Sequence, residues 1–238
     1  MKKVGLIGHG YWGKILLPKL HQVADVKFIC RSKNNYIDHL SPVDWVFVVT
    51  PNKTHYDIVK NCILKGKNVF CEKPLTLNYL QSMELFLLAR ERQVKLYVDD
   101  VFNYRAERKL VRERVSPESI TDVYWSSPTS NYLYDNLYHD LYLLYHALSS
   151  PSPLAITLGS ENGRLQINNI KFCYINSPTK LHRINDIDLS HRPETNDAVS
   201  SMLDVVLNGE PNYLHNSQVS LHSNYIINLI QNQRSPQT

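Results

Sequence analysis

The glycine-rich segment near the start of the chain has residue types and spacing suited to binding phosphate. Gly8, Gly10 and Gly13 form a G-x-G-x-x-G pattern directly after the short apolar run at residues 3–7. In such a turn the first glycine permits a tight bend, the second lets a pyrophosphate approach the backbone, and the third lets a helix pack closely on the strand. Amide groups at the helix start would hold the phosphate. The alternative, a tight turn that binds no ligand, stays open. The predicted phosphate-binding residues are Gly8, Gly10, Tyr11, Trp12 and Gly13.

The residues after the second apolar run, 26–30, bear on which dinucleotide is bound. An acidic residue at this position usually accepts hydrogen bonds from the adenine ribose, whereas an arginine accommodates a 2′-phosphate. This chain has Arg31 and Ser32 there, and no carboxylate that would repel a phosphate. The pair offers a charge and a hydroxyl donor, so NADP(H) is favoured over NAD(H). A merely solvated Arg31 is the alternative.

The elements that would position these residues alternate along the first half of the chain. Short uncharged strands and amphipathic helices follow one another, which predicts a doubly wound parallel sheet of the Rossmann type, of fold class α/β. Ser116 and Pro117 break this pattern. We therefore expect a dinucleotide-binding domain over residues 1–118. The predicted strands are 3–7, 26–30, 45–50, 68–71 and 95–98, with helices from the glycine turn to residue 21 and at 55–65, 77–93 and 105–115.

The second half has a different pattern. Several short strand-like runs with turn signals lie between residues 155 and 184, which predicts an antiparallel sheet. We expect a smaller α+β domain over residues 119–238 that serves substrate binding and oligomerisation. The other predicted elements are a strand at 121–126 and helices at 137–148, 194–207 and 217–230.

Two further motifs carry a family resemblance. Residues 49–55 read VTPNKTH and residues 71–76 read CEKPLT, and together with the glycine segment they resemble the Gfo/Idh/MocA family of NAD(P)-dependent oxidoreductases. The resemblance runs nearly continuously to Asn103-Tyr104-Arg105. It implies a Rossmann domain followed by a second domain with an open antiparallel sheet, which must be truncated in a chain this short.

The resemblance also implies roles for individual residues. The end of the third strand would lie beside the cofactor, and the tripeptide Glu72-Lys73-Pro74 would hold its nicotinamide side, often with a cis bond before the proline. Lys73 would lie in the active site on a substrate hydroxyl, where a cationic nicotinamide and desolvation would lower its pKa. A surface lysine is the alternative. The residues placed at the cofactor in this way are Thr50, Pro51, Asn52, His55, Glu72, Lys73 and Pro74.

The family's second domain carries an aspartate four residues before a histidine, and Asp135 and His139 match that pattern. Spacing by four puts both on one face of a helix, with Asp140 beside them. His139 would accept the proton of a substrate hydroxyl while Asp135 or Lys73 assists in orientation. A helix cap with a solvated polar face is the alternative. Tyr104 and Arg105 would border the substrate or form a salt-bridged surface.

Composition limits the remaining function classes. The 238 residues are 43% hydrophobic and carry a net charge of +4 without a basic block, which gives no case for nucleic acid. No apolar run approaches the roughly 18 residues of a membrane span, so we expect a cytoplasmic protein. The four cysteines lack CxxC spacing, which favours reduced thiols and no metal site.

Together these features predict an oxidoreductase that moves a hydride between NADP(H) or NAD(H) and a small polyhydroxylated substrate such as a sugar, nucleotide sugar or cyclitol. The alternative is a catalytically silent sensor or scaffold that binds a dinucleotide, which the shortened second domain would favour. An exposed sheet face would need a partner, so we expect a homo-oligomer, at least a dimer.

Overall fold

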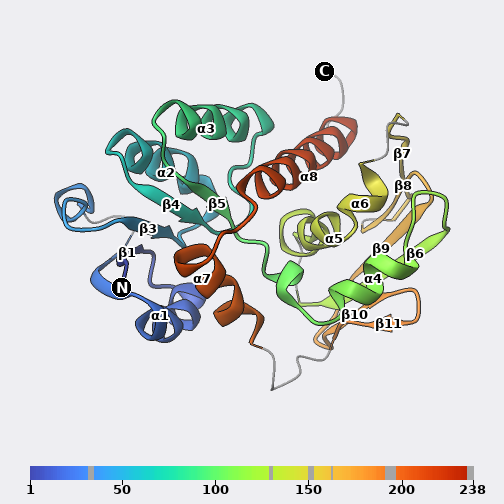
Figure 1. Cartoon of the computed structure of the whole chain (residues 1–238). Helices are drawn as coiled ribbons and strands as arrows, with labels where there is room; N and C mark the ends of the chain where they lie inside the picture. Colours follow the sequence, from blue (N-terminus) through green and yellow to red (C-terminus); the bar gives the residue numbers. More distant parts are fainter. Residues whose placement is uncertain (32–34, 129–130, 150–152, 162, 191–196, 235–238) are drawn as a thin grey trace. The chain divides into compact units, whose positions relative to one another are not determined.

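The computed structural model describes residues 1–31, 35–128, 131–149, 153–161, 163–190 and 197–234 (Figure 1). The chain divides into two compact units. The first unit comprises Met1–Val101 and Ala198–Asn224, and the second comprises Phe102–Asp197 and Tyr225–Thr238. The C-terminal segment that belongs to the first unit was not foreseen. That residues 1–118 and 119–238 form two separate domains stays a prediction.

The first unit contains a parallel five-stranded sheet with the order β2-β1-β3-β4-β5, which confirms the predicted Rossmann architecture. Its central strand, β3, is wholly apolar, and the ring of Phe47 on it stacks on the ring of Phe70 on a neighbouring strand with centroids 4.9 Å apart. Strands of this kind are covered by helices on both faces. The strands are β1 Lys3–Ile7, β2 Asp25–Cys30, β3 Trp45–Val48, β4 Asn68–Cys71 and β5 Leu96–Val98.

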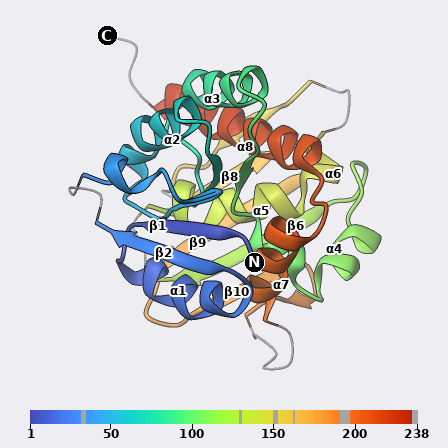
Figure 2. The same ribbon diagram turned by 60° about the vertical axis from the view of Figure 1, so that its left-hand side comes forward.

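Helices flank this sheet on two sides (Figures 1 and 2). Helix α1 (Tyr11–Val23) packs with α7 (Ala198–Asn208), and α2 (His55–Leu64) packs with α3 (Tyr79–Glu91) on the other side. Because all five strands are parallel, the residues that follow them meet at one edge of the sheet, where α/β proteins bind their ligands. This edge is called the carboxyl edge below.

The outer strand β5 is covered by the last helix, α8 (Tyr213–Arg234). The Asn216 side chain accepts a hydrogen bond from the Val98 amide at 2.9 Å and donates one to the Val98 carbonyl at 2.8 Å. This contact satisfies backbone groups that an open sheet edge would expose. Helix α8 starts four residues before the predicted start, where the Asn212 side chain accepts a hydrogen bond from the His215 amide.

The second unit contains a six-stranded sheet with the order β11-β10-β6-β9-β8-β7. Its ladders are antiparallel, as predicted, except that β6 and β9 pair in parallel, which makes the sheet mixed. Turn signals fix only the pairing of consecutive strands, whereas β6 is separated from the later strands by helices and enters between β9 and β10. The strands are β6 Thr121–Ser127, β7 Ile156–Leu158, β8 Arg164–Ile167, β9 Ile170–Asn176, β10 Leu181–Ile184 and β11 Ile187–Asp188.

The helix predicted at residues 137–148 is instead three short elements. A π-helical turn at Leu133–Leu137 leads into α5 (Tyr138–Leu143), and α6 (Tyr145–Leu148) follows. The short 3-10 turn Val101–Tyr104 begins at the last residue before the second unit, and helix α4 (Arg108–Arg114) follows within that unit. Of the helix predicted at 194–207, residues 194–196 lie outside the described residues. Among the described helices, none has the length and apolar character needed to cross a membrane.

Candidate functional site

The glycine turn at the end of β1 has a geometry that only glycine can adopt. Gly8 has φ +108°, and a Cβ atom there would lie 2.1 Å from the Val49 carbonyl oxygen. A Cβ on Gly13 would lie 2.2 Å from the Gly8 carbonyl oxygen. Both contacts are with rigid backbone, so these two glycines are needed to bring strand, turn and helix together.

Gly10 differs from these two glycines because it borders open space. A Cβ added to Gly10 would have no atom within 4 Å. Gly10 precedes the thirteen-residue helix α1, whose first turn has no acidic side chain and whose N-terminus has no side-chain cap. The first amide groups of such a helix attract anions. Tyr11 is 71% exposed beside Trp12, so this corner fits the approach of a dinucleotide pyrophosphate.

The end of β2 lies next to this turn. The Gly8 amide donates to the Cys30 carbonyl at 2.7 Å, and β2 ends at Cys30. Arg31 is therefore the first residue after the strand, and it is exposed. Ser32 lies outside the described residues. Arg31 thus occupies the position at which an adenine ribose is read in Rossmann folds.

At the end of β3, backbone and hydroxyl groups are tied into a compact turn. The Thr54 hydroxyl lies 2.7 Å from the Thr50 hydroxyl and 2.8 Å from the Pro51 carbonyl oxygen, and Asn52 begins the 3-10 turn Asn52–Thr54. Thr50 is buried, whereas Pro51 is exposed and Asn52 is half-buried. The turn therefore presents its Pro51-Asn52 surface at the carboxyl edge.

His55 is fully buried and is held by backbone oxygens. Its Nε2 lies 2.7 Å from the Thr50 carbonyl oxygen and its Nδ1 lies 2.8 Å from the Pro74 carbonyl oxygen. Burial lowers the pKa of His55, and the hydrogen bonds to Pro74 and Thr50 oppose that change. The ring joins the end of β3 to the segment after β4, where the Lys73–Pro74 peptide bond is cis, as the resemblance implied. His55 thus positions two segments from the interior.

Two buried carboxyl groups lie at the ends of β4 and β5, and sequence inspection did not anticipate their pairing. Cys71 and Val98 are partners in the parallel ladder, so Glu72 and Asp99 are the next residues on adjacent strands. Both are more than nine-tenths buried, and their side chains share a hydrogen bond. Burial and the charge of Asp99 raise the pKa of Glu72 well above its usual range. Two adjacent carboxyl groups cannot both ionise cheaply, so the pair holds a proton.

Asp99 and Lys73 complete this arrangement. Burial raises the pKa of Asp99, while the hydrogen bonds from Glu72 and from the Val101 amide, together with the charge of Lys73, oppose that rise. The Val101 amide donates to Asp99 Oδ1 at 2.9 Å. The higher pKa of the pair therefore belongs to Glu72, and Asp99, which lies near the charge of Lys73, has the lower one.

In the second unit, Asp135 and His139 lie in different local environments. Asp135 is exposed within the π-helical turn, and His139 is buried in α5 with its ring 4.3 Å from the ring of Phe102. The wider spacing of a π-helical turn means that the four-residue rule for one helix face does not apply across it. Such single turns are frequent at functional sites.

A buried network begins at the next residue, Asp140, which is fully buried. The Tyr174 hydroxyl donates to Asp140 Oδ2 at 2.8 Å, and His182 Nε2 lies 2.7 Å from Asp140 Oδ1. Burial and Asp140 raise the pKa of Tyr174 well above its usual range. The Trp125 ring stacks on His182 at 3.9 Å and also faces His139. Sequence analysis singled out neither Tyr174 nor His182, because each is an isolated polar residue on a short strand.

The structure thus distributes the predicted residues over both units. The glycine turn, Arg31, Thr50 and Glu72 follow neighbouring strands of one parallel sheet, and Lys73 belongs to the same unit. Asp135 and His139 belong to the second unit. The fold class is therefore a Rossmann unit with a polar carboxyl edge, together with a second unit built on a mixed sheet.

Comparisons with known proteins agree with this class. Residues 21–100 match the sequence model of the Gfo/Idh/MocA oxidoreductase family with an NAD-binding Rossmann fold. An uncharacterized oxidoreductase of Synechocystis sp. is 37% identical over 90 residues, which are 37% of this chain and 24% of that protein. Other similar proteins are named dehydrogenases and reductases. The sequence similarity to this family is carried by residues 21–100.

Solved structures share the fold over a much larger part of the chain. A UDP-N-acetylglucosamine 3-dehydrogenase from Acidithiobacillus ferrooxidans superposes with a TM-score of 0.76 at 16% identity, covering 97% of this chain and 96% of that one. A 3-ketoreductase from Actinomadura kijaniata, solved with TDP-benzene and NADP, gives 0.70 at 18% identity, covering 95% and 96%. By contrast, the sequence matches to the first three curated relatives span 24% to 41% of their length.

Proposed function

We propose that this protein transfers a hydride between NADP(H) or NAD(H) and a small polyhydroxylated substrate, such as a sugar, nucleotide sugar or cyclitol. The observation that carries the proposal is the carboxyl edge of the first unit, where the glycine turn and the Glu72–Asp99 pair with Lys73 follow strands of the same parallel sheet. One end of that edge suits phosphate and the other suits proton-dependent chemistry.

The residues proposed to hold the dinucleotide follow the strand order. The glycine turn would bind the pyrophosphate, the residues after β2 the adenine ribose, and those after β3 and β4 the nicotinamide half. His55 would act from the interior by fixing Thr50 and Pro74. The proposed cofactor-binding residues are Gly8, Gly10, Tyr11, Trp12, Gly13, Arg31, Ser32, Thr50, Pro51, Asn52, His55, Glu72, Lys73 and Pro74.

We propose NADP(H) as the preferred cofactor. Arg31 is exposed at the position next to β2, and a guanidinium group can bind a 2′-phosphate with two parallel hydrogen bonds. Replacing Arg31 with alanine should therefore weaken NADPH binding much more than NADH binding. A uniform loss for both cofactors would contradict the assignment.

The proposed chemistry divides between three side chains of this protein. A bound nicotinamide dinucleotide would supply the hydride donor or acceptor. Lys73 would donate a hydrogen bond to the substrate oxygen and stabilise charge that develops there. His139 would accept the hydroxyl proton, with Asp135 assisting its orientation. The Glu72–Asp99 pair would keep a negative charge beside Lys73 and fix its ammonium group.

A sensor or scaffold that binds the cofactor without turnover is the second candidate. The observation that favours it is the extent of the sequence matches, which cover less than half of the first curated relatives. A sensor or scaffold differs from the oxidoreductase in that it binds the cofactor but transfers no hydride.

The test begins with titration of the purified protein with NADPH and NADH, followed by nicotinamide fluorescence and melting temperature. A ligand at one hundred times its Kd stabilises the native state by about 2.7 kcal/mol. Binding then justifies a screen of sugars, nucleotide sugars and cyclitols with wild type, Lys73→Ala and His139→Ala. Turnover that both substitutions abolish supports the enzyme, binding without turnover supports the sensor, and failure to bind either cofactor contradicts both.

We also propose a homo-oligomer of at least two chains. Ile175, on the second sheet, is 42% exposed although it is a large apolar residue on a strand, and Cys173 and Leu181 on the same sheet are half-buried. Light scattering at several concentrations tests this proposal, and a strictly monomeric protein contradicts it.

A further inference from the structure

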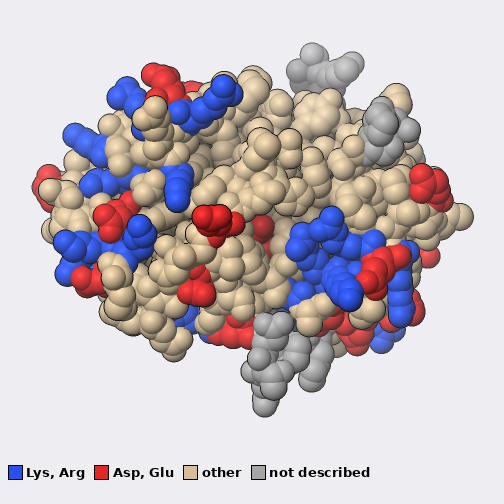
Figure 3. Space-filling model, in the orientation of Figure 1, with Lys and Arg blue, Asp and Glu red and all other residues tan. Residues whose placement is uncertain are grey.

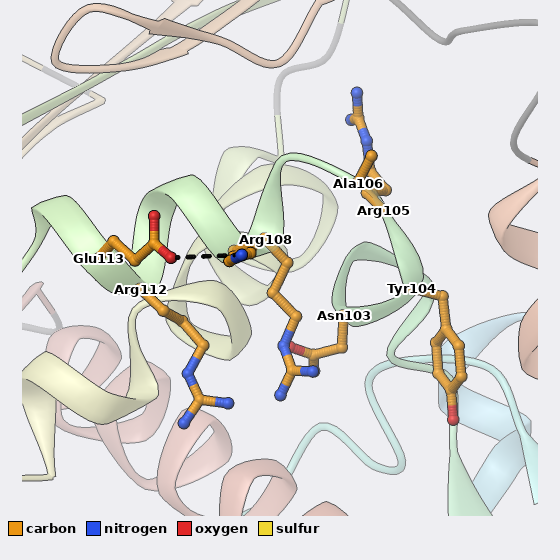
Figure 4. A pocket seen from close by; sticks show the side chains of 8 residues that line it. Asn103, Tyr104, Arg105, Ala106, Arg108, Arg112 and Glu113 are labelled. Atoms are coloured by element: carbon orange, nitrogen blue, oxygen red, sulfur yellow. Dashed lines mark ion pairs between the residues drawn. The ribbon is translucent and has the colours of Figure 1, made fainter.

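A cavity of about 470 Å³ lies in the second unit, beside the segment that joins the 3-10 turn Val101–Tyr104 to helix α4 (Figure 4). Its lining is cationic, with four basic side chains and one carboxylate. Figure 3 shows lysine and arginine side chains gathered over the region where Figure 1 places α4. The lining residues are Asn103, Tyr104, Arg105, Ala106, Arg108, Lys109, Arg112 and Glu113.

Arg105 and Lys109 make contacts within the second unit. Arg105 donates to Glu107 at 3.2 Å and to the Leu189 carbonyl at 2.8 Å, and its guanidinium group lies over the Phe102 ring. In Figure 4 the Arg105 side chain points away from the other labelled arginines. Lys109 pairs with Glu113 at 3.8 Å, so the one carboxylate of the lining is already balanced.

Arg108 and Arg112 both extend from helix α4. They are four residues apart on α4, which puts them on one face of the helix, and Figure 4 shows both side chains directed to the same side as Asn103. Val111, between them in sequence, is fully buried and anchors α4 to the second unit. Among the described residues, Arg112 has no carboxylate partner. The anchored helix α4 thus holds the backbone of Arg108 and Arg112 in place, and both guanidinium groups extend from the same face.

We propose that Arg108 and Arg112, with the Asn103 amide, form a binding site for the phosphoryl group of a small ligand. Two guanidinium groups supply planar pairs of N–H donors that match phosphate oxygens, and Asn103 adds a neutral donor. The cavity is large enough for a phosphate ester or a diphosphate and small for a macromolecule. The ligand is the substrate, which makes that substrate a sugar phosphate or a nucleotide sugar; this last step rests on the proposed oxidoreductase function.

Inorganic pyrophosphate is the probe that tests the site, titrated into the protein without cofactor and followed by calorimetry. Arg108→Gln and Arg112→Gln each remove one charge from the cavity. The matched control is Arg183→Gln, which removes the same charge from an exposed position on β10 of the same unit. We expect saturable binding that weakens about tenfold in each cavity variant and changes less than about twofold in the control. Unchanged melting temperatures verify that the variants fold.

The glycine turn of the first unit could also bind pyrophosphate, so Gly10→Glu is measured in parallel. Binding at the arginine site persists in Gly10→Glu and is lost in Arg108→Gln and Arg112→Gln. The proposal is overturned if wild type shows no saturable binding, if Gly10→Glu alone abolishes it, or if Arg183→Gln weakens it as much as the cavity variants do.

This experiment can fail independently of the proposed oxidoreductase function, because it requires neither cofactor nor turnover. Pyrophosphate binding at the arginines together with no binding of NADPH or NADH would leave the site intact and contradict the oxidoreductase. Turnover of a sugar that carries no phosphate, with KM unchanged by Arg108→Gln, would leave the oxidoreductase intact and overturn the assignment of the substrate.

Discussion

The two units hold their buried polar groups in different ways. In the first unit, His55 is fixed by two backbone carbonyl oxygens, and Glu72 and Asp99 directly follow two hydrogen-bonded strands. In the second unit, Asp140 on α5 is bonded to side chains on β9 and β10, which are 34 and 42 residues away in sequence.

The first site is therefore built mainly by the backbone and the second mainly by side chains. A site at consecutive strand ends depends on local turns and on the register of a parallel sheet. A network of side chains depends on every one of its members, because removing one leaves the others buried without partners. Four substitutions test this contrast between the two units.

The largest effect is expected for Gly8→Ala. The new Cβ would meet the Val49 carbonyl at 2.1 Å in a backbone conformation that L side chains rarely adopt, so we expect a loss of about 4 kcal/mol in the free energy of unfolding. Gly10→Ala is the matched control. Its Cβ enters open space at φ −84°, so the stability should change by less than about 1 kcal/mol. Urea denaturation measures the unfolding free energy of both variants. Equal losses would show that the backbone conformation of Gly8 and its contact with Val49 do not determine the effect.

The next effect is expected for Asp140→Ala, which leaves the Tyr174 hydroxyl and the His182 ring buried without their shared acceptor. Such unpaired groups cost about 3 kcal/mol together. Asp122→Ala, at an exposed position on β6, is the control and should cost less than about 0.5 kcal/mol. If Asp140→Ala were equally mild, the network would contribute little to the second unit.

A smaller and pH-dependent effect is expected for Glu72→Gln. The folded-state pKa of Glu72 lies above its unfolded value of about 4.3, so the unfolded chain loses this proton first as pH rises. The stability that the protonated pair contributes is complete below about pH 4.3 and falls as pH rises toward the raised pKa. The glutamine side chain of this variant resembles the protonated form of Glu72, so the unfolding free energy of Glu72→Gln should fall much less as pH rises. Urea denaturation between pH 4 and 8 measures it, and parallel curves for both proteins would contradict the shared proton.

The smallest effect is expected for Arg114→Gln, which breaks an ion pair with Asp186 at the surface of the second unit. Exposed pairs of this kind contribute about 0.5 kcal/mol or less because water and salt screen them. Thermal denaturation at low and high salt measures the difference. A loss comparable to that of Asp140→Ala would mean that surface charges, and not the buried network, stabilise this unit.

The same contrast explains which features were predictable. The five strands of the first unit and the helices between them were predicted to within about two residues, because apolar runs, glycine turns and strand ends are local signals. In the second unit the strand-like runs were found, but the parallel pairing of β6 with β9 was missed. Pairing between strands separated by helices has no local signature.

The sequence alone determined the Rossmann unit, the glycine turn and the positions of Arg31, Thr50, Glu72 and Lys73 at strand ends, because each depends on neighbours within a few residues. Only the tertiary structure decided that Glu72 and Asp99 are buried side by side, that His55 faces the interior, and that Asp140, Tyr174 and His182 meet. Such groups acquire their pKa values and partners from burial and long-range register, and a sequence pattern carries neither.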